Sequence, residues 1–203
     1  MFDYLIIGGG IAGISAAARL SEHGATVVLE AEAHLAYHTS GRSAALYEQN
    51  YGSPSTVALA KAARTDFDGM LSGVLSPRGF LLVCLQGEEA QFEYDLEHMH
   101  LSEVAVADAA KLVPILDSSS VIRTASSATA RDIDTDMMLQ IFARRIRTNG
   151  GTVETNQQVT AIDKMKQGWC VTTGSGQYEA QKIVNAAGAW GDEIAQLAGL
   201  PKI

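Results

Sequence analysis

The feature that most constrains the fold is a glycine-rich segment near the amino terminus. Gly8, Gly10 and Gly13 follow the short apolar run Tyr4–Ile7 in the pattern G-x-G-x-x-G. An alanine-rich segment of helical character comes next, and a second β-branched run ends at Glu30, 22 residues beyond Gly8. Strand, glycine turn, helix, strand and acid occur in this order, which predicts an α/β fold built on a parallel sheet.

Each position of this pattern has a physical reason in a dinucleotide site. Gly8 lets the chain turn sharply out of the strand, Gly10 leaves room for a pyrophosphate, and Gly13 lets the helix pack close to the sheet. The amide groups and positive dipole end at the start of the helix attract phosphates. Glu30 is placed to bind a ribose and disfavours a 2′-phosphate. The pattern alone does not separate FAD from NAD, although its position at the extreme amino terminus favours FAD.

Charge and cysteine content exclude several classes of protein. The 203 residues carry a formal net charge of −8 and no run of Lys or Arg, which disfavours nucleic acid as a partner. The two cysteines, Cys84 and Cys170, lie far apart without metal-ligand spacing, so no metal site is expected. Their apolar surroundings predict free thiols and a reducing compartment.

The apolar stretch Leu5–Leu20 resembles a signal peptide only superficially. Asp3 precedes it instead of a basic region, glycines interrupt it, and 16 residues are few for a membrane span. We therefore expect a cytoplasmic protein, with peripheral membrane contact left open.

Two further segments have the composition of close-approach loops. Tyr37–Ala45 is rich in small and polar residues that expose amide and hydroxyl groups, although composition alone favours an ordinary surface loop. The buried strand 183–185 leads into the small residues of Ala186–Trp190, where backbone can approach a ligand. The remaining pattern predicts helices at 53–71, 88–100, 108–112, 134–149 and 192–198, strands at 80–85, 121–125, 153, 159–162, 169–173, 178–180 and 183–185, and a hairpin turn at 174–176.

Four separated segments resemble the D-amino acid oxidase superfamily of FAD-dependent oxidoreductases: Gly8–Glu30, Tyr37–Ala45, Arg131–Gly150 and Val184–Trp190. Within it, Tyr37–Ala45 followed by Tyr51-Gly52, together with Asp132–Asp136, is most similar to the D-arginine dehydrogenase group. The resemblance implies a Rossmann-like FAD-binding domain with a parallel sheet, formed by residues 1–74 and 130–203. It also implies part of an α+β substrate domain at residues 75–129.

The resemblance assigns site residues along the whole chain, with FAD bound non-covalently. The pyrophosphate would lie on Gly8, Gly10, Ala12 and Gly13, and the adenosine ribose on Glu30 with Ala31 beside it. The pyrophosphate, ribityl chain and isoalloxazine would be wrapped by Thr39, Ser40, Gly41, Arg42, Ser43, Ala44, Ala45 and Leu46. Val159 would contact the adenine through its backbone, Ala187 and Gly188 would pass close to the flavin, and Tyr51 would contact the substrate.

Two departures from the D-arginine dehydrogenase pattern bear on the substrate. Leu46 stands where that group has a histidine, and Phe80 follows Ser76–Gly79 where that group has a glutamate. A buried guanidinium would lack its charge partner without that carboxylate. The expected reaction is therefore oxidation of a D-amino acid with a neutral, apolar side chain to the imino acid by hydride transfer to flavin N5. Oxygen and a quinone stay open as electron acceptors.

Members of this superfamily continue for more than a hundred residues beyond the position that corresponds to Ile203. The Arg and Tyr that bind the substrate carboxylate lie in that part, so no catalytic residue is assigned and we expect this chain alone to turn over weakly or not at all. One alternative is the same fold acting on a 2-hydroxy acid, glycine, sarcosine or glycerol 3-phosphate. An alternative of another class is a non-catalytic FAD-binding fragment.

Overall fold

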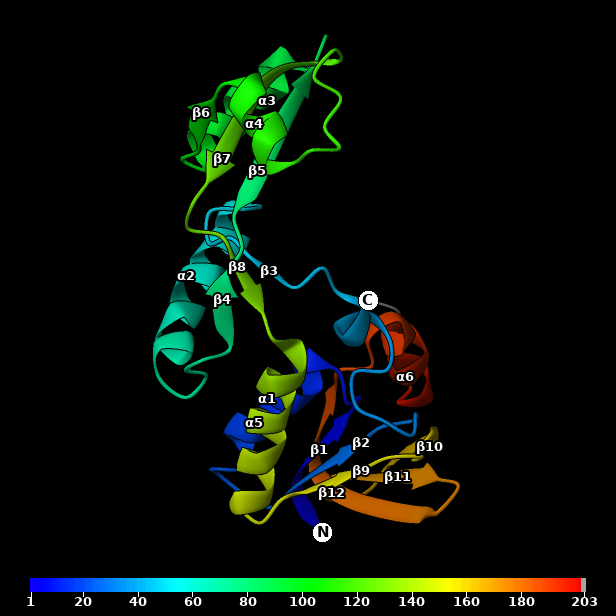
Figure 1. Ribbon diagram of the computed structural model, residues 1–203. Helices are drawn as coiled ribbons and strands as arrows, with labels where there is room; N and C mark the ends of the chain where they lie inside the picture. The colour runs from blue at the N-terminus through cyan, green and yellow to red at the C-terminus, as the bar shows by residue number, and fades with distance from the viewer. Residues whose placement is uncertain (202–203) are drawn as a thin grey trace. The chain divides into compact units, whose positions relative to one another are not determined.

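The computed structural model describes residues 1–201, which fall into two compact units (Figure 1). The first unit comprises Met1–Ala44 and the chain from Thr135 onward, and the second comprises Ala45–Asp134. The sequence placed the domain boundaries at 74/75 and 129/130 instead. The difference arises because β8 (Arg131–Ile133) pairs with both β3 (Leu46–Tyr47) and β4 (Leu75–Pro77), so one sheet joins strands from both predicted domains.

A six-stranded sheet with the order β10-β11-β12-β1-β2-β9 forms the centre of the first unit. β1 (Phe2–Ile7) is parallel to β2 (Thr26–Leu29) and to β12 (Gly176–Asn185), and β2 is parallel to β9 (Thr152–Glu154). Ile7 lies opposite both Leu29 and Asn185, so the carboxyl ends of three neighbouring strands are level. β10 (Val159–Lys164) and β11 (Trp169–Thr173) complete the sheet in antiparallel order.

Helices cover both faces of this sheet, as the consecutive buried residues Leu5, Ile6 and Ile7 of β1 require, because successive side chains point to opposite faces. α1 (Ile11–Leu20) and α5 (Thr135–Thr148) pack together (Figure 1) and contribute the buried side chains of Ile14 and Ile146. α6 (Gly191–Leu197) packs on β10 and β12. There Leu5 and Ile7 belong to a core cluster against which Ile194 packs.

The second unit is an α+β structure with two small antiparallel sheets. β3, β8 and β4 (Leu75–Pro77) form one sheet, and β5 (Phe80–Leu85), β7 (Val121–Ser127) and β6 (Ser102–Val104) form the other. Its helices are α2 (Pro54–Asp68), α3 (Glu89–His98) and α4 (Val106–Leu112). The side chain of Ser53 accepts a hydrogen bond from the Thr56 amide at 3.3 Å and caps α2, as the Ser-Pro pair indicates.

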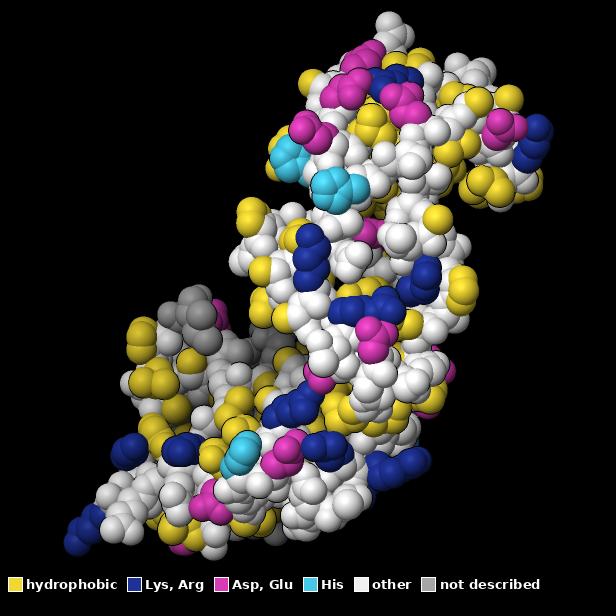
Figure 2. Space-filling view, turned by 90° about the vertical axis from the view of Figure 1, so that its left-hand side faces the viewer, with side chains coloured by type: hydrophobic (Ala, Val, Ile, Leu, Met, Phe, Trp, Pro, Cys, Tyr) yellow, Lys and Arg dark blue, Asp and Glu magenta, His cyan; other side chains and the backbone are white. Residues whose placement is uncertain are grey.

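The predicted α/β class with a parallel sheet is confirmed, and β5 and β11 have the predicted bounds. The two strands expected at 178–180 and 183–185 are one strand, β12, so that expectation was wrong in its division. β12 is long because its first half pairs with antiparallel β11 and its second half with parallel β1. In the described part of the chain, no helix is long and apolar enough to span a membrane. Figure 2 shows acidic and basic side chains interspersed on the face that it presents.

Candidate functional site

The chain turns sharply where β1 ends, at Gly8. This residue has a φ of +114°, which favours glycine, and its amide donates to the Leu29 carbonyl at 2.9 Å. A Cβ at Gly8 would lie 2.3 Å from the Ala186 carbonyl oxygen, so the turn packs directly on the segment that follows β12. The loops after β1 and β12 therefore meet at the level edge of the sheet.

The first turn of α1 has space beside Gly10 but is tightly packed at Gly13. A Cβ added at Gly10 would meet only the Ser40 hydroxyl, at 3.2 Å, whereas one at Gly13 would lie 1.9 Å from the Gly8 carbonyl oxygen. The Ser40 hydroxyl also accepts a hydrogen bond from the Ile11 amide at 3.0 Å. The loop after β2 thus caps α1 through the Ser40 hydroxyl, beside Gly10, which itself has no side chain to obstruct a phosphate.

The carboxylate of Glu30 is held at this corner. Its Oε2 accepts a hydrogen bond from the Gly9 amide at 2.6 Å, and its Oε1 accepts one from the Glu32 amide at 2.8 Å. The Gln157 amide donates to the Glu30 carbonyl at 2.8 Å, which fixes the backbone on the other side. Glu30 is therefore half-buried beside the glycines and does not point into solvent away from them.

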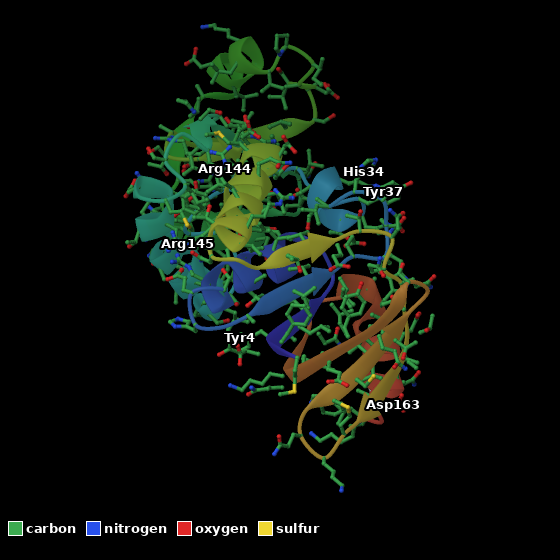
Figure 3. The ribbon with its side chains drawn as sticks, turned by 90° about the horizontal axis from the view of Figure 1, so that it is seen from below. Tyr4, His34, Tyr37, Arg144, Arg145 and Asp163 are labelled. Carbon is green, nitrogen blue, oxygen red and sulfur yellow. The ribbon has the colours of Figure 1, made fainter. Side chains whose placement is uncertain are left out.

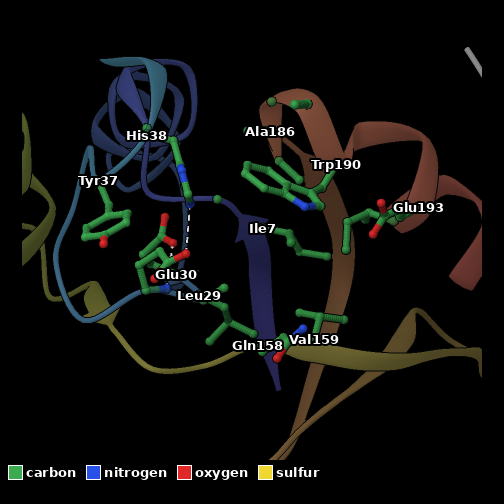
Figure 4. Close-up of a pocket in the computed structure, with 18 of the residues that line it drawn as sticks. Ile7, Leu29, Glu30, Tyr37, His38, Gln158, Val159, Ala186, Trp190 and Glu193 are labelled. Carbon is green, nitrogen blue, oxygen red and sulfur yellow. Dashed lines mark hydrogen bonds and ion pairs between the residues drawn. The ribbon is translucent and has the colours of Figure 1, made fainter. Parts of the chain in front are cut away.

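These elements surround a cavity of about 390 Å³ whose walls all belong to the first unit (Figure 4). The glycine corner, the end of β2, the loop after it, the start of β10 and the segment 186–197 each contribute. The lining residues are Ile7, Gly8, Gly10, Leu29, Glu30, Ala31, Glu32, Ala36, Tyr37, His38, Thr39, Ser40, Gln157, Gln158, Val159, Ala186, Ala187, Gly188, Ala189, Trp190, Glu193, Ile194 and Leu197.

Side-chain hydrogen bonds connect the part of the cavity wall around Val159 to the β11–β12 hairpin. Gln157 accepts a hydrogen bond from the Thr173 hydroxyl at 2.7 Å and donates to the Ser175 hydroxyl at 3.1 Å. The Tyr178 hydroxyl donates to Glu154 at 2.5 Å, and this bond, with burial, raises the pKa of Tyr178 to about 12. The backbone of Val159 is thereby fixed where the sequence places an adenine contact.

The structure brings together many, but not all, of the residues expected to hold the cofactor. The ones that line the cavity are Gly8, Gly10, Glu30, Ala31, Thr39, Ser40, Val159, Ala187 and Gly188. Gly13 is buried under the corner, Ala12 is exposed, and neither lines the cavity. The cavity wall also excludes Gly41, Arg42, Ser43, Ala44, Ala45 and Leu46.

The three candidate substrate residues all lie in the second unit. Leu46 is in β3, opposite Asp132, and Phe80 begins β5, opposite Ser127. Tyr51 follows β3 and is 61% exposed. Their contact with a substrate remains a prediction.

Several residues that line the cavity were not predicted from the sequence, above all Glu32, His38, Trp190 and Glu193. His38 and Trp190 lie inside the two segments that composition singled out. Nothing in either segment alone showed that their side chains meet across the cavity.

The geometry fits an adenine dinucleotide. A pyrophosphate finds space at Gly10, beside the start of α1, and a ribose finds the Glu30 carboxylate. Among residues 1–201, no group of three or more His, Cys, Asp or Glu side chains is arranged to hold a metal ion.

Comparison with known proteins agrees with this geometry. A family model described as FAD dependent oxidoreductase matches residues 3–203. The mitochondrial dimethylglycine dehydrogenase of Mus musculus is 26% identical over 98% of this chain, and the human enzyme of the same name shows the same identity and coverage.

Solved structures share the fold at lower identity. L-α-glycerophosphate oxidase from Mycoplasma pneumoniae, determined with FAD bound, has a TM-score of 0.86 and 20% identity over 98% of this chain. Glycine oxidase from Geobacillus kaustophilus has a TM-score of 0.83 at 18% identity over 98%, and L-proline dehydrogenase from P. horikoshii 0.82 at 22% over 97%.

The chain spans about a quarter of the length of the dimethylglycine dehydrogenases (24%) and 55–58% of these three solved chains. These relatives support the family that the sequence suggested, but they do not single out D-arginine dehydrogenase.

Proposed function

The chain belongs to the FAD dependent oxidoreductase family, and from this membership we propose that the cavity of the first unit holds FAD non-covalently for the oxidation of a small amino acid. The observation that carries the proposal is the joint position of Gly8, Gly10 and Glu30 around one cavity. A glycine-rich turn in an unrelated fold would have no reason to place an acid from the next strand against the glycine amides.

Each wall of the cavity is assigned one part of the cofactor. The start of α1, with Gly10 and Ser40, takes the pyrophosphate, and Glu30 takes the adenosine ribose. The backbone at Val159 takes the adenine, while Ala187 and Gly188 approach the flavin from the end of β12. The sequence-based assignment of Ala12, Gly13 and the later loop residues 41–46 stays a proposal without support from the cavity wall.

When bound, FAD would supply the redox chemistry as the hydride acceptor for the substrate carbon that carries the amine. The chain's own contribution is to orient the dinucleotide and to shield the reacting end from water. We propose that Leu46, Tyr51 and Phe80 give the second unit its substrate contacts. None of the three carries a full charge at neutral pH, so the proposed substrate is a D-amino acid with a neutral side chain.

A second candidate substrate is an N-methylated glycine. The similarity to dimethylglycine dehydrogenase over 98% of the chain favours it. Glycine, L-proline, a 2-hydroxy acid and glycerol 3-phosphate complete the set of substrates to test.

We further propose that the protein is cytoplasmic and that it passes electrons to oxygen or to a quinone. An oxygen-electrode assay and a quinone-reduction assay distinguish these two acceptors.

The first experiment is a titration of the purified protein with FAD, followed by flavin fluorescence. We expect saturable binding that weakens at least tenfold in the Glu30→Ala variant, because hydrogen bonds to a charged group are worth about 1.5–3 kcal/mol each. Glu179→Gln is the matched control, since Glu179 is exposed on β12 and lies outside the cavity wall. Absence of saturable binding by the unaltered protein would refute the proposal.

The second experiment is reduction of a dye by the FAD-loaded protein with each candidate substrate. Turnover of neutral D-amino acids supports the first candidate, and turnover of dimethylglycine or sarcosine supports the second. A preference for D-arginine or D-lysine would contradict the roles given to Leu46 and Phe80. Saturable FAD binding without turnover of any substrate would make this chain an FAD-binding module.

A further inference from the structure

The charge of the cavity wall is unusual for a site proposed to hold a pyrophosphate. Three carboxylates line it, those of Glu30, Glu32 and Glu193, and the wall as described contains no Lys or Arg. The arginines of α5 lie outside it: Figure 3 shows Arg144 and Arg145 on that helix, and Arg145 is paired with Glu22 at 2.8 Å. His38 is therefore the one described lining residue that can acquire a positive charge.

His38 is fixed between two walls of the cavity (Figure 4). Its Nε2 lies 2.8 Å from Glu32 Oε1, on the loop that follows β2. Its ring centroid lies 4.6 Å from that of Trp190, which belongs to the short helical turn η2 (Gly188–Trp190) after β12. The Tyr37 ring meets it edge-on at 5.0 Å. The imidazole is thus held in place by contacts that do not depend on a ligand.

The hydrogen bond from Nε2 to Glu32 determines whether Nδ1, the other ring nitrogen of His38, is a hydrogen-bond donor or an acceptor. A carboxylate only accepts, so Nε2 carries the proton in this bond, and a neutral ring then presents Nδ1 as an acceptor. An acceptor repels phosphate oxygens. A protonated ring donates from both nitrogens, so Nδ1 can bind a phosphate oxygen while Nε2 keeps Glu32.

We propose that His38 is the cationic group of the cavity wall, and that it takes up a proton as the pyrophosphate binds and joins the two walls through Trp190. This inference rests on the proposed function and deepens it. The charged groups that line the cavity with His38 are Glu32, which it contacts on its own loop, Glu30 at the end of β2 and Glu193 on α6. Arg42 lies over the Tyr37 ring at 5.7 Å and outside the cavity wall.

Proton uptake at one site makes FAD affinity depend on pH. Protonated histidine is favoured at low pH, so the affinity for FAD should rise as pH falls. Nδ1 donates to a phosphate oxygen only when the ring is protonated, and losing a hydrogen bond to a charged group lowers affinity about tenfold or more. We therefore expect FAD to bind about tenfold more tightly at about pH 6 than at about pH 8.5.

The test compares this ratio between the unaltered protein and His38→Gln, which keeps a donor for Glu32 but cannot become charged. We expect His38→Gln to bind FAD more weakly at about pH 6 and to lose most of the pH dependence. Any contribution from the three carboxylates persists in this variant and is subtracted. His23→Gln is the matched control, because His23 is exposed in the same unit and lies outside the cavity wall. His38→Arg, whose charge is permanent, should restore tight binding at the higher pH.

A second readout needs no FAD. In a Trp169→Phe background Trp190 is the only tryptophan, and a protonated imidazole in ring contact quenches indole fluorescence. We expect the emission of Trp190 to fall on acidification, and His38→Gln to abolish this change. If the emission of the Trp169→Phe protein that retains His38 does not change with pH, the contact between the His38 and Trp190 rings is contradicted.

The outcomes separate this inference from the proposed function. Saturable FAD binding whose pH dependence is the same in His38→Gln would overturn the role of His38 and leave the FAD site intact. Failure of the unaltered protein to bind FAD at either pH would overturn both.

Discussion

The two units place their candidate site residues by different means. In the first unit, residues far apart in the sequence meet because the parallel strands β12, β1 and β2 end at one level. In the second unit, Leu46, Tyr51 and Phe80 lie on or beside antiparallel strands, and the sheet that contains Leu46 has strands of two or three residues. A parallel sheet therefore lets a local pattern predict a shared site, whereas small antiparallel sheets leave it to long-range pairing.

The largest expected effect comes from filling the glycine corner. Gly8→Val combines a β-branched side chain at positive φ with overlap on the Ala186 carbonyl, and should destabilise the first unit by roughly 4–6 kcal/mol. Urea unfolding measures the loss, and FAD binding should vanish with it. Gly174→Ala, where an added Cβ meets nothing within 4 Å, should change stability little. Equal losses of unfolding free energy in Gly8→Val and Gly174→Ala would contradict the claim that the turn at Gly8 requires glycine.

The next effect tests whether the units are separable. Phe92 is 2% exposed in the core of the second unit, against Cys84 and Ala125. Phe92→Ala should cost about 3–4 kcal/mol of unfolding free energy. FAD affinity, which we assign to the first unit, should stay within about twofold. Tyr94→Ala, at a side chain 55% exposed, is the control. A large loss of FAD affinity in Phe92→Ala would show that cofactor binding depends on both units.

A smaller effect is expected from Glu48, a buried acid in the second unit. Its carboxylate accepts hydrogen bonds from the Ser127 hydroxyl at 2.8 Å and from the Asn50 amide at 3.2 Å. Glu48→Ala removes the acceptor for both donors and should destabilise the unit by about 1–2 kcal/mol. Thermal unfolding measures this, with Gln49→Ala as the neighbouring control. Unchanged stability would mean that this network does not hold the segment before Tyr51.

The smallest effect concerns the bond between Tyr178 and Glu154. The folded-state pKa of Tyr178 is raised from 10.0 to about 12, so the stability that this bond contributes is present below pH 10 and is lost as pH rises towards 12. Tyr178→Phe should lower the unfolding free energy by about 0.5–1 kcal/mol at neutral pH. The variant should also lose less stability than the unaltered protein between these pH values. An identical alkaline decline in both proteins would contradict the assignment.

The parts of the fold that follow from local chemistry could be predicted from the sequence. Gly8 needs positive φ, Gly13 permits close packing and Glu30 closes a strand, and each requirement is visible within thirty residues. β12 was divided in two because polar residues interrupt it, and only its two different partners make it continuous.

The rest of the site depends on contacts that a local pattern does not contain. His38 meets Trp190 across 152 positions of sequence, through the register of the parallel sheet. The division at 44/45 follows from the pairing of Asp132 with both Leu46 and Ser76, which places β3, β8 and β4 in one sheet. The ring contact and the unit boundary both arise from pairing between distant strands, which the identities of the individual residues do not predict.

The most direct test of the central claim is the response of backbone amide NMR signals to FAD. We predict that the signals of Gly8, Gly10 and Glu30 shift most as the pyrophosphate and ribose bind. Signals from α3 in the second unit should serve as the unperturbed reference. Shifts that leave the glycine corner unchanged and gather elsewhere would contradict the account.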